Sequence, residues 1–125
     1  MIEVVKAILE KNGKILLIKR SLDSKFFPNL WDLPGGKIEP EEDSTSALVR
    51  ETEEETSLKI NSTKKLGEYQ ITEQDIPIHF QVFKVETFEG RVQLSKDHTD
   101  SIWISKTEMN NYELAPIVKL FFKIL

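Results

Sequence analysis

Apolar residues in the first twenty positions fall into two short runs with a turn between them. Residues 4–9 and 14–20 are rich in Val, Ile and Leu, and Asn12-Gly13 stands between the two runs. An Asn-Gly pair between apolar runs is the strongest short-range signal for a β-hairpin. We therefore expect two strands here, the second largely buried and ending at Arg20.

The pattern beyond this hairpin alternates between loops and further strands. A loop over residues 21–30 contains Phe26 and Phe27, which would either flank a pocket or plug one end of the core. Residues 31–34 predict a short strand that leads into a pair of glycines. Alternating apolar residues predict later strands, the first two joined by a polar turn, at 64–71, 78–85 and 102–104.

Two segments have the features of helices. Residues 44–56 contain no Gly or Pro and follow Asp43, a good N-cap, so they predict about three to four helical turns. Pro116 suits the first turn of a second, amphipathic helix docked on the sheet. Its apolar stripe comprises Ile117, Leu120, Phe121 and Ile124, with Val118, Phe122 and Leu125 off the stripe. Either a homodimer interface or deeper burial in the monomer would explain these extra apolar residues.

The carboxylates of the first helix are placed unusually. At about 100° per residue, Glu51, Glu54 and Glu55 share one third of the circumference with the apolar residues that should face the core. Like charges at this spacing repel one another, although a solvated acidic face is also common. Arg50 can neutralise one carboxylate, but a hard divalent cation, Mg²⁺ or Mn²⁺, suits the cluster better. The opposite side of the helix carries Thr45, Thr52, Glu53 and Thr56.

Composition limits the classes of protein to consider. The chain has 125 residues, 39% of them hydrophobic, which is enough for one domain with a single proper core. It has no cysteine, so disulfides and thiolate metal sites are excluded. There is no long apolar run and no signal-peptide pattern, and we expect a cytoplasmic protein without a membrane partner. The net charge of −4 argues against binding of a nucleic-acid polymer.

Residues 36–58 resemble the Nudix box. That pattern is Gly, five residues, Glu, seven residues, Arg-Glu, an aliphatic residue, any residue, Glu-Glu, any residue, Gly and an aliphatic residue. Thr52 stands where the family has an aliphatic residue. Ser57 replaces the glycine, and must either adopt a left-handed conformation or end the helix differently. The matching positions are Gly36, Glu42, Arg50, Glu51, Glu54, Glu55 and Leu58.

The resemblance implies a fold and an activity. Residues 31–35 are also similar to the segment that leads into the family's box, and residues 1–125 would form one Nudix hydrolase domain. The implied fold is an α/β/α sandwich with a mixed β-sheet between helices. The implied activity is Mg²⁺-dependent hydrolysis of a pyrophosphate bond in a nucleotide substrate, most similar to the MutT-type (d)NTP pyrophosphohydrolases. ADP-ribose hydrolysis, dinucleoside polyphosphate hydrolysis and a non-catalytic nucleotide-binding module are the alternatives.

The same resemblance implies roles for particular residues. Glu54 is the first choice for the general base, followed by Glu51 and Asp97, and Arg50 would orient a box glutamate. Asp97 lies in a loop before a Trp-containing strand, where many members carry an acidic residue, and His98 is the weaker candidate there. The implied metal ligands are Glu51, Glu54, Glu55, the Gly35 carbonyl and Asp97. The implied substrate-binding residues are Arg20, Gly36 and Lys37.

Two observations concern the choice of substrate. The bacterial prototype of the MutT type reads the purine with an amide side chain just before the proline of the last helix, and this chain has Leu114-Ala115 there. Selectivity for 8-oxoguanine would therefore need Asn110 or Asn111 instead, and CTP-type specificity stays open. His79 is a substrate contact only as an alternative to an ordinary surface or structural role.

Overall fold

Seven strands and three helices make up the described part of the chain. The structure is a computed structural model and describes residues 1–124. The strands are β1 (Ile2–Lys11), β2 (Lys14–Arg20), β3 (Trp31–Asp32), β4 (Gly35–Lys37), β5 (Lys59–Glu73), β6 (Ile76–Glu89) and β7 (His98–Ile104). The helices are α1 (Ser44–Thr56), the short 3-10 helix η1 (Lys106–Asn111) and α2 (Pro116–Phe122).

Strand β1 is the centre of a mixed sheet with the order β3-β2-β1-β6-β5. It runs parallel to β6 on one side. On its other side it pairs antiparallel with β4 near its start and with β2 at the hairpin. Strand β7 adds to β2. The sheet therefore brings the segment with the two glycines, β4, directly beside the first strand of the chain.

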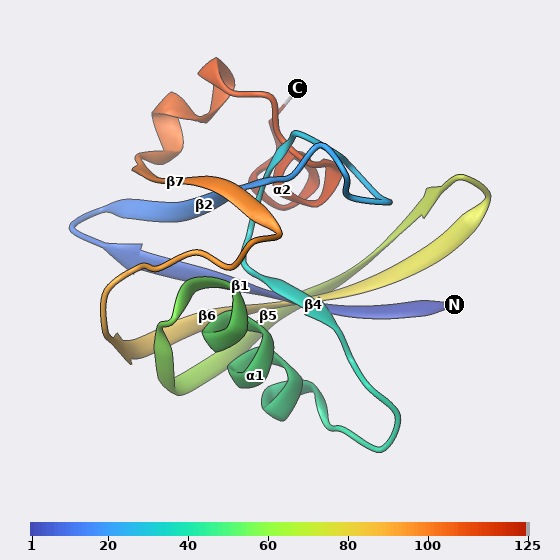
Figure 1. The fold of residues 1–125 in the computed structure, drawn as a ribbon, viewed down its shortest axis with the longest axis horizontal. Coiled ribbons are helices and arrows are strands. Elements are labelled where there is room, and N and C mark those ends of the chain that lie inside the picture. The colour runs from blue at the N-terminus through green and yellow to red at the C-terminus, as the bar shows by residue number, and fades with distance from the viewer. Residues whose placement is uncertain (125) are drawn as a thin grey trace.

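The core is divided between the two faces of this sheet. Successive side chains of a strand point to opposite faces, so Val4 and Ile8 join one cluster while Val5 and Leu9 join the other. Helix α2 packs on the first face and α1 on the second (Figure 1). The predicted α/β/α sandwich with a mixed sheet is thereby confirmed.

The hairpin of β5 and β6 is longer than the sequence pattern predicted. The expected strands 64–71 and 78–85 are extended at both ends, to 15 and 14 residues. The turn narrows to Gln74 and Asp75, which both have positive φ, as two-residue hairpin turns require. Polar residues at the strand ends join the ladder because backbone pairing along the hairpin does not depend on side-chain hydrophobicity.

Helix α1 has the predicted bounds. The Asp43 side chain accepts a hydrogen bond of 2.7 Å from the Ser46 amide. At the other end Ser57 adopts the left-handed conformation, with φ 67°, which is the first of the two expected alternatives. The amide of Gln93 donates to the Thr56 carbonyl, and the Ser57 hydroxyl donates to the Gln93 carbonyl. These contacts with the following loop stabilise a helix end that lacks the usual glycine.

Helix α2 is shorter than predicted, and its buried side differs. Ile117 and Val118 are buried, whereas Leu120 is 45% exposed, so the predicted placement of Val118 and Leu120 was wrong. The helix docks through its first turn and ends at Lys123, which is left-handed. The expectation for Leu125 lies outside the described residues. Within residues 1–124 the structure contains no helix long and apolar enough to cross a membrane.

Candidate active site

Two consecutive glycines allow β4 to lie between β1 and the carboxylates of α1. Gly35 has φ 141°, and a Cβ there would overlap the Val5 carbonyl oxygen. A Cβ on Gly36 would lie 2.5 Å from the carboxyl carbon of Glu51. Neither position accepts another residue without a shift of its neighbours. We call Gly35-Gly36 the glycine turn, and it fixes the floor of the site.

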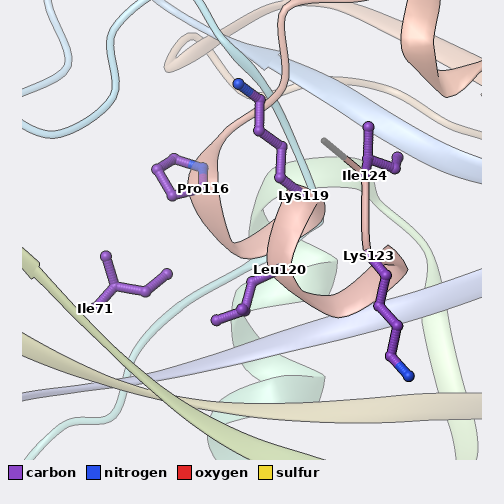
Figure 2. Close-up of a pocket in the computed structure, with 6 residues that line it drawn as sticks. All are labelled: Ile71, Pro116, Lys119, Leu120, Lys123 and Ile124. Carbon is purple, nitrogen blue, oxygen red and sulfur yellow. The ribbon is translucent and has the colours of Figure 1, made fainter.

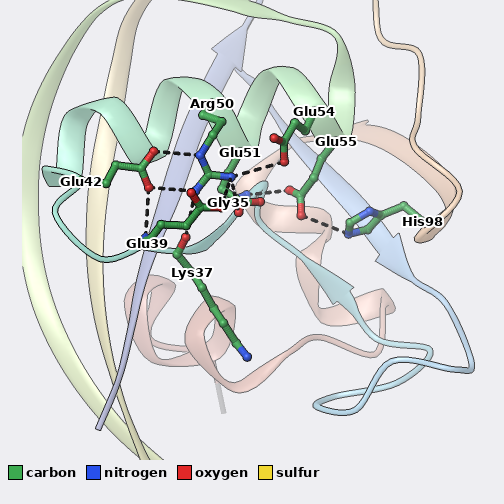
Figure 3. A network of polar contacts seen from close by, with 9 residues as sticks. All are labelled: Gly35, Lys37, Glu39, Glu42, Arg50, Glu51, Glu54, Glu55 and His98. Atoms are coloured by element: carbon green, nitrogen blue, oxygen red, sulfur yellow. Dashed lines mark hydrogen bonds and ion pairs between the residues drawn. The ribbon is translucent and has the colours of Figure 1, made fainter.

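Arg50 ties α1 to the loop that precedes it. Its Nε and Nη2 atoms donate to the two carboxylate oxygens of Glu42 at 2.8 and 2.9 Å, a bidentate pair. Nη2 also donates to the Lys37 carbonyl at 3.1 Å, and Nη1 donates to Glu51 at 2.9 Å. We call Arg50, Glu42, Glu51 and the Lys37 carbonyl the Arg50 clamp (Figure 3). The clamp holds the loop after the glycine turn against the helix.

Contacts within the Arg50 clamp also shift the pKa values of its side chains. The guanidinium lowers the pKa of Glu42 to about 2, helped by the Glu39 amide, which donates to the same carboxylate. Glu42 in turn raises the pKa of Arg50. Burial raises the pKa of Glu51, and Arg50 opposes that effect. Arg50 is therefore a permanently charged residue that keeps Glu42 ionised.

Glu55 lies in a very different environment. Its side chain is 15% exposed, and its Oε1 atom accepts a 2.8 Å hydrogen bond from the Gly35 amide. Burial raises the pKa of Glu55 to about 8, against the opposing effects of the Lys6 ammonium and the Gly35 amide. His98 Nε2 lies 3.9 Å from the other oxygen of Glu55 (Figure 3). Burial lowers the pKa of His98 to about 4, so this imidazole is neutral at pH 7.

The rotation of α1 about its axis differs from the prediction. Glu51 and Glu55 point inward, but Glu54 is 59% exposed and contacts only the edge of Arg50, at 3.4 Å, so its predicted inward placement was wrong. Thr52 and Thr56 were expected to face solvent and are fully buried. The Thr56 hydroxyl donates to the Thr52 carbonyl, so burial leaves it hydrogen-bonded. Because threonine side chains are small, this side of the helix packs closely against the sheet.

The box carboxylates fit a divalent cation by their chemistry. Within residues 1–124, no three Asp, Glu or His side chains already converge as a metal site. Glu51 and Glu55 nevertheless flank the glycine turn, where the glycines place no side chain beside the two carboxylates. Glu54 has an exposed side chain on the same helix that is free to reorient. Such an all-oxygen donor set matches the preference of hard divalent cations.

A cavity of about 160 Å³ opens beside Glu55, and we call it the Glu55 cavity. The three predicted substrate-binding residues, Arg20, Gly36 and Lys37, all line it. Phe26 and Phe27 line this cavity, and Phe26 is also part of the core with Phe27 packed against it, so the two expected roles are combined. The other apolar residues that line it are Ile2, Val4, Ile78 and Phe80.

A buried ion pair in the wall of the Glu55 cavity was not predicted from the sequence. Lys6 Nζ lies 2.9 Å from Asp32 Oδ2, and both side chains are almost fully buried. Arg20 Nη1 approaches the same oxygen at 3.3 Å. A lysine in the middle of the apolar run 4–9 was the signal that could have revealed this pair, because a charge on a buried strand needs a partner.

A second cavity, of about 290 Å³, lies on the other side of Arg20 and Glu55. Asp97 and His98 line it together with Ser21, Asp23 and Ser24. Asp97 is exposed, and its backbone carbonyl accepts a hydrogen bond from the Ser21 amide. The structure thus brings His98 to 3.9 Å from Glu55, and Asp97 lines the same cavity as both.

The other candidates for substrate recognition lie elsewhere. His79 hydrogen-bonds to Glu3 at 2.6 Å and contacts Glu68 at 2.7 Å, so the structural role is the one observed. Asn110 and Asn111 line separate hollows near η1. Leu114 and Ala115 are buried.

Comparison with known proteins establishes the family. The sandwich with a glycine turn and an acidic helix matches the NUDIX domain over residues 2–123. The chain is 39% identical to the CTP pyrophosphohydrolase of Escherichia coli (strain K12), over 93% of this chain and 84% of that protein. The crystal structure of the MutT protein from Methanosarcina mazei Go1 has a TM-score of 0.90 and 28% identity, over 98% of this chain and 90% of that one. The solution structure of the Escherichia coli ORF135 protein has a TM-score of 0.85 and 36% identity, over 98% and 86%.

The class of protein follows from this agreement between fold and site. It is an α/β/α sandwich with a Nudix box on its glycine turn and first helix. The chain belongs to the Nudix family and is MutT-like, and members of that family typically use a divalent metal ion.

Proposed function

We propose that the protein hydrolyses a pyrophosphate bond of a nucleoside triphosphate, with CTP as the first candidate substrate. The observation that carries this proposal is the lining of the Glu55 cavity, which combines aromatic and aliphatic residues suited to a base with Arg20 and Lys37, suited to phosphates. The similarity to a CTP pyrophosphohydrolase supports the choice of CTP. The products would be a nucleoside monophosphate and pyrophosphate.

The chemical problem in this reaction is negative charge. Water must add to one phosphorus while the bridging P–O bond breaks, and the leaving phosphate keeps the electron pair. Arg20 and Lys37 would bind phosphate oxygens, and the glycine turn would let the substrate approach the backbone. Mg²⁺, with Mn²⁺ as the alternative, would supply further positive charge when bound by the predicted metal ligands. These ligands are Glu51, Glu54, Glu55, the Gly35 carbonyl and Asp97.

A carboxylate must take the proton from the attacking water. Glu54 is our first choice, because Glu51 is bonded to Arg50 and Glu55 to the Gly35 amide, whereas Glu54 has only a 3.4 Å contact. Glu51 and Asp97 are the next candidates. Arg50 would act through Glu51 and Glu42 as a positioning residue. A base within reach of the water is the geometric requirement for this role.

An apolar surface beside α2 supports a homodimer. Ile71, Leu120 and Ile124 line a hollow of about 490 Å³, and Lys119 and Lys123 extend from its rim in different directions (Figure 2). Pairing across a two-fold axis would cover the exposed Leu120 of both copies. Sedimentation equilibrium should give twice the chain mass, and Leu120→Asp should give the monomer. A wild-type monomer at high concentration contradicts this assembly.

A substrate screen tests the proposed activity. The panel contains the four NTPs and dNTPs, oxidised dNTPs, ADP-ribose and a dinucleoside polyphosphate, each with Mg²⁺ and with a chelator. Pyrophosphate release should be fastest with CTP or dCTP and should disappear with the chelator. Faster turnover of ADP-ribose or a dinucleoside polyphosphate would reassign the substrate. Turnover of nothing in the panel would favour a non-catalytic nucleotide-binding module.

A further inference from the structure

The Lys6–Asp32 pair is the only ion pair among residues 1–124 in which both side chains are almost fully buried. Lys6 lies on the same face of β1 as Val4 and Ile8, by the alternation of a strand. Val4 and Lys6 both line the Glu55 cavity, and Asp32 lines it from β3. The pair therefore places a buried donor and a buried acceptor in the wall of the Glu55 cavity.

Stability alone does not explain this pair. Removing a lysine and an aspartate from water costs several kcal/mol per ion in general, and apolar residues of similar size often serve the fold equally well. The neighbouring positions of β1 are all apolar, from Val4 to Leu9, which shows that the strand packs without charge elsewhere. A charged pair at a cavity wall is better explained by its interaction with a ligand in the cavity.

The hydrogen bonds of the pair leave capacity for a ligand. Lys6 Nζ donates to Asp32 Oδ2 at 2.9 Å and to the Leu33 carbonyl at 3.2 Å, and an ammonium has a third N–H. Asp32 Oδ1 accepts from the Leu33 amide at 2.8 Å, and Oδ2 also accepts from Arg20. Each carboxylate has about four acceptor positions. The pair can thus offer a donor and an acceptor side by side to a group in the cavity.

We propose that Lys6 and Asp32 select the base of the nucleotide and favour cytosine over uracil. Lys6 donates to the ring nitrogen or carbonyl of cytosine, and Asp32 accepts from its exocyclic amine. Uracil has a carbonyl in place of that amine, which would face the Asp32 carboxylate without a proton between them. Adenine has a similar pattern of amine and ring nitrogen, but the small volume of the cavity, about 160 Å³, favours a one-ring base.

This inference rests on the proposed function, since it assigns the base of the same substrate. Phe27 and Phe80 line the same cavity and provide apolar surface against a flat ring. Arg20 lies between Asp32 and the second cavity, so it is placed to join base recognition to phosphate binding.

Two variants test the selectivity, and the second of them leaves no unpaired charge in place of the buried pair. Asp32→Asn keeps the shape and one oxygen for Lys6 but presents an amide N–H₂ that suits the uracil carbonyl. The double variant Lys6→Met with Asp32→Asn removes both charges together. Lys65→Met is the matched control, because it breaks a Lys–Glu pair, with Glu68, on the surface. The measured quantity is the ratio of kcat/KM for CTP to kcat/KM for UTP, which a general loss of folded protein leaves unchanged.

We expect the wild type and Lys65→Met to prefer CTP by about 10²-fold, and both test variants to lower that ratio by about tenfold or more. A wild type without preference, or test variants that keep the ratio within about twofold, would overturn the proposal. Calorimetric binding of CMP and UMP without metal separates this from the failure of the proposed function. If the wild type hydrolyses no nucleotide, tighter binding of CMP that Asp32→Asn abolishes still supports base selection, and equal binding of the two overturns it.

Discussion

Two carboxylates of the Nudix box, Glu42 in the loop before α1 and Glu55 in the last turn of α1, differ in what surrounds them. Glu42 in the Arg50 clamp is paired bidentately with a guanidinium, and its pKa falls to about 2. Glu55 beside the glycine turn is buried with one amide donor, and its pKa rises to about 8. The same type of side chain is thus held as a permanent anion in one place and desolvated in the other.

This difference separates the residues that fix the geometry of the site from those that would bind a ligand. An anion fully satisfied by protein donors has little left to offer a ligand, so the Arg50 clamp fixes geometry. A desolvated carboxylate is stabilised by any cation that reaches it, so the Glu55 cavity is where binding of a charged ligand gains most. The predictions below test this division from the largest expected effect to the smallest.

Glu55→Gln should have the largest effect on activity. Glutamine keeps an oxygen for the Gly35 amide but cannot ionise when a cation binds, so we expect kcat for CTP to fall by about 10³-fold with little change in Tm. Glu53→Gln is the matched control on the exposed side of α1 and should keep wild-type turnover. A kcat within about threefold of wild type would remove Glu55 from the mechanism. Pyrophosphate release and thermal melts measure both quantities.

Glu54→Gln should lower kcat by about 10²-fold or more, the scale of an acid-base or metal-binding group. Its side chain is mostly exposed, so the fold should not change. Steady-state kinetics with saturating Mg²⁺ distinguish the two roles, since added metal rescues a weakened ligand better than a lost base. Unchanged turnover at every Mg²⁺ concentration would show that Glu54 takes no part.

Arg50→Lys should have a smaller effect, because a lysine keeps the charge but cannot form the bidentate pair with Glu42. We expect kcat/KM to fall by about tenfold, as for residues that position others, together with a lower Tm. Lys65→Arg on the surface serves as the control. Loss of activity as large as in Glu55→Gln would mean that Arg50 contacts the substrate and that the division between clamp and cavity is wrong.

The smallest effect concerns acid stability. The pKa of Glu42 is lowered from its usual 4.5 to about 2, so its contribution is present above pH 4.5 and is lost as the pH falls through about 2. Glu42→Gln removes this contribution, so its stability should decline less steeply than that of the wild type between pH 4.5 and pH 2. Urea midpoints measured across this interval check the prediction. Parallel curves for the two proteins would contradict it.

The sequence predicted the bounds of α1 better than the rotation of this helix about its axis. The bounds of α1 follow from Asp43 and a stretch without Gly or Pro, which are local signals. Which side of α1 is buried depends on packing against the sheet. Thr52 lies on the buried side, where Glu54 was predicted. The charged residues alone could not show this, because a carboxylate and a threonine are both polar in a periodicity argument.

The candidate site was predicted to a similar extent. Arg20 ends β2, and Gly36 and Lys37 begin the box segment. Local sequence patterns were therefore enough to indicate these residues, which line the Glu55 cavity. The Lys6–Asp32 pair joins β1 to β3 across 26 positions, and such a pairing appears only when the sheet order is known. The approach of His98 to Glu55 depends likewise on how the loop before β7 packs on α1.

The most direct test of the central claim is a phosphorus NMR spectrum of CTP incubated with the wild-type protein and Mg²⁺. The account predicts that the three resonances of CTP are replaced by those of CMP and pyrophosphate, and that Glu55→Gln leaves CTP intact over the same time. Intact CTP with the wild type, or conversion to CDP and orthophosphate, would contradict it.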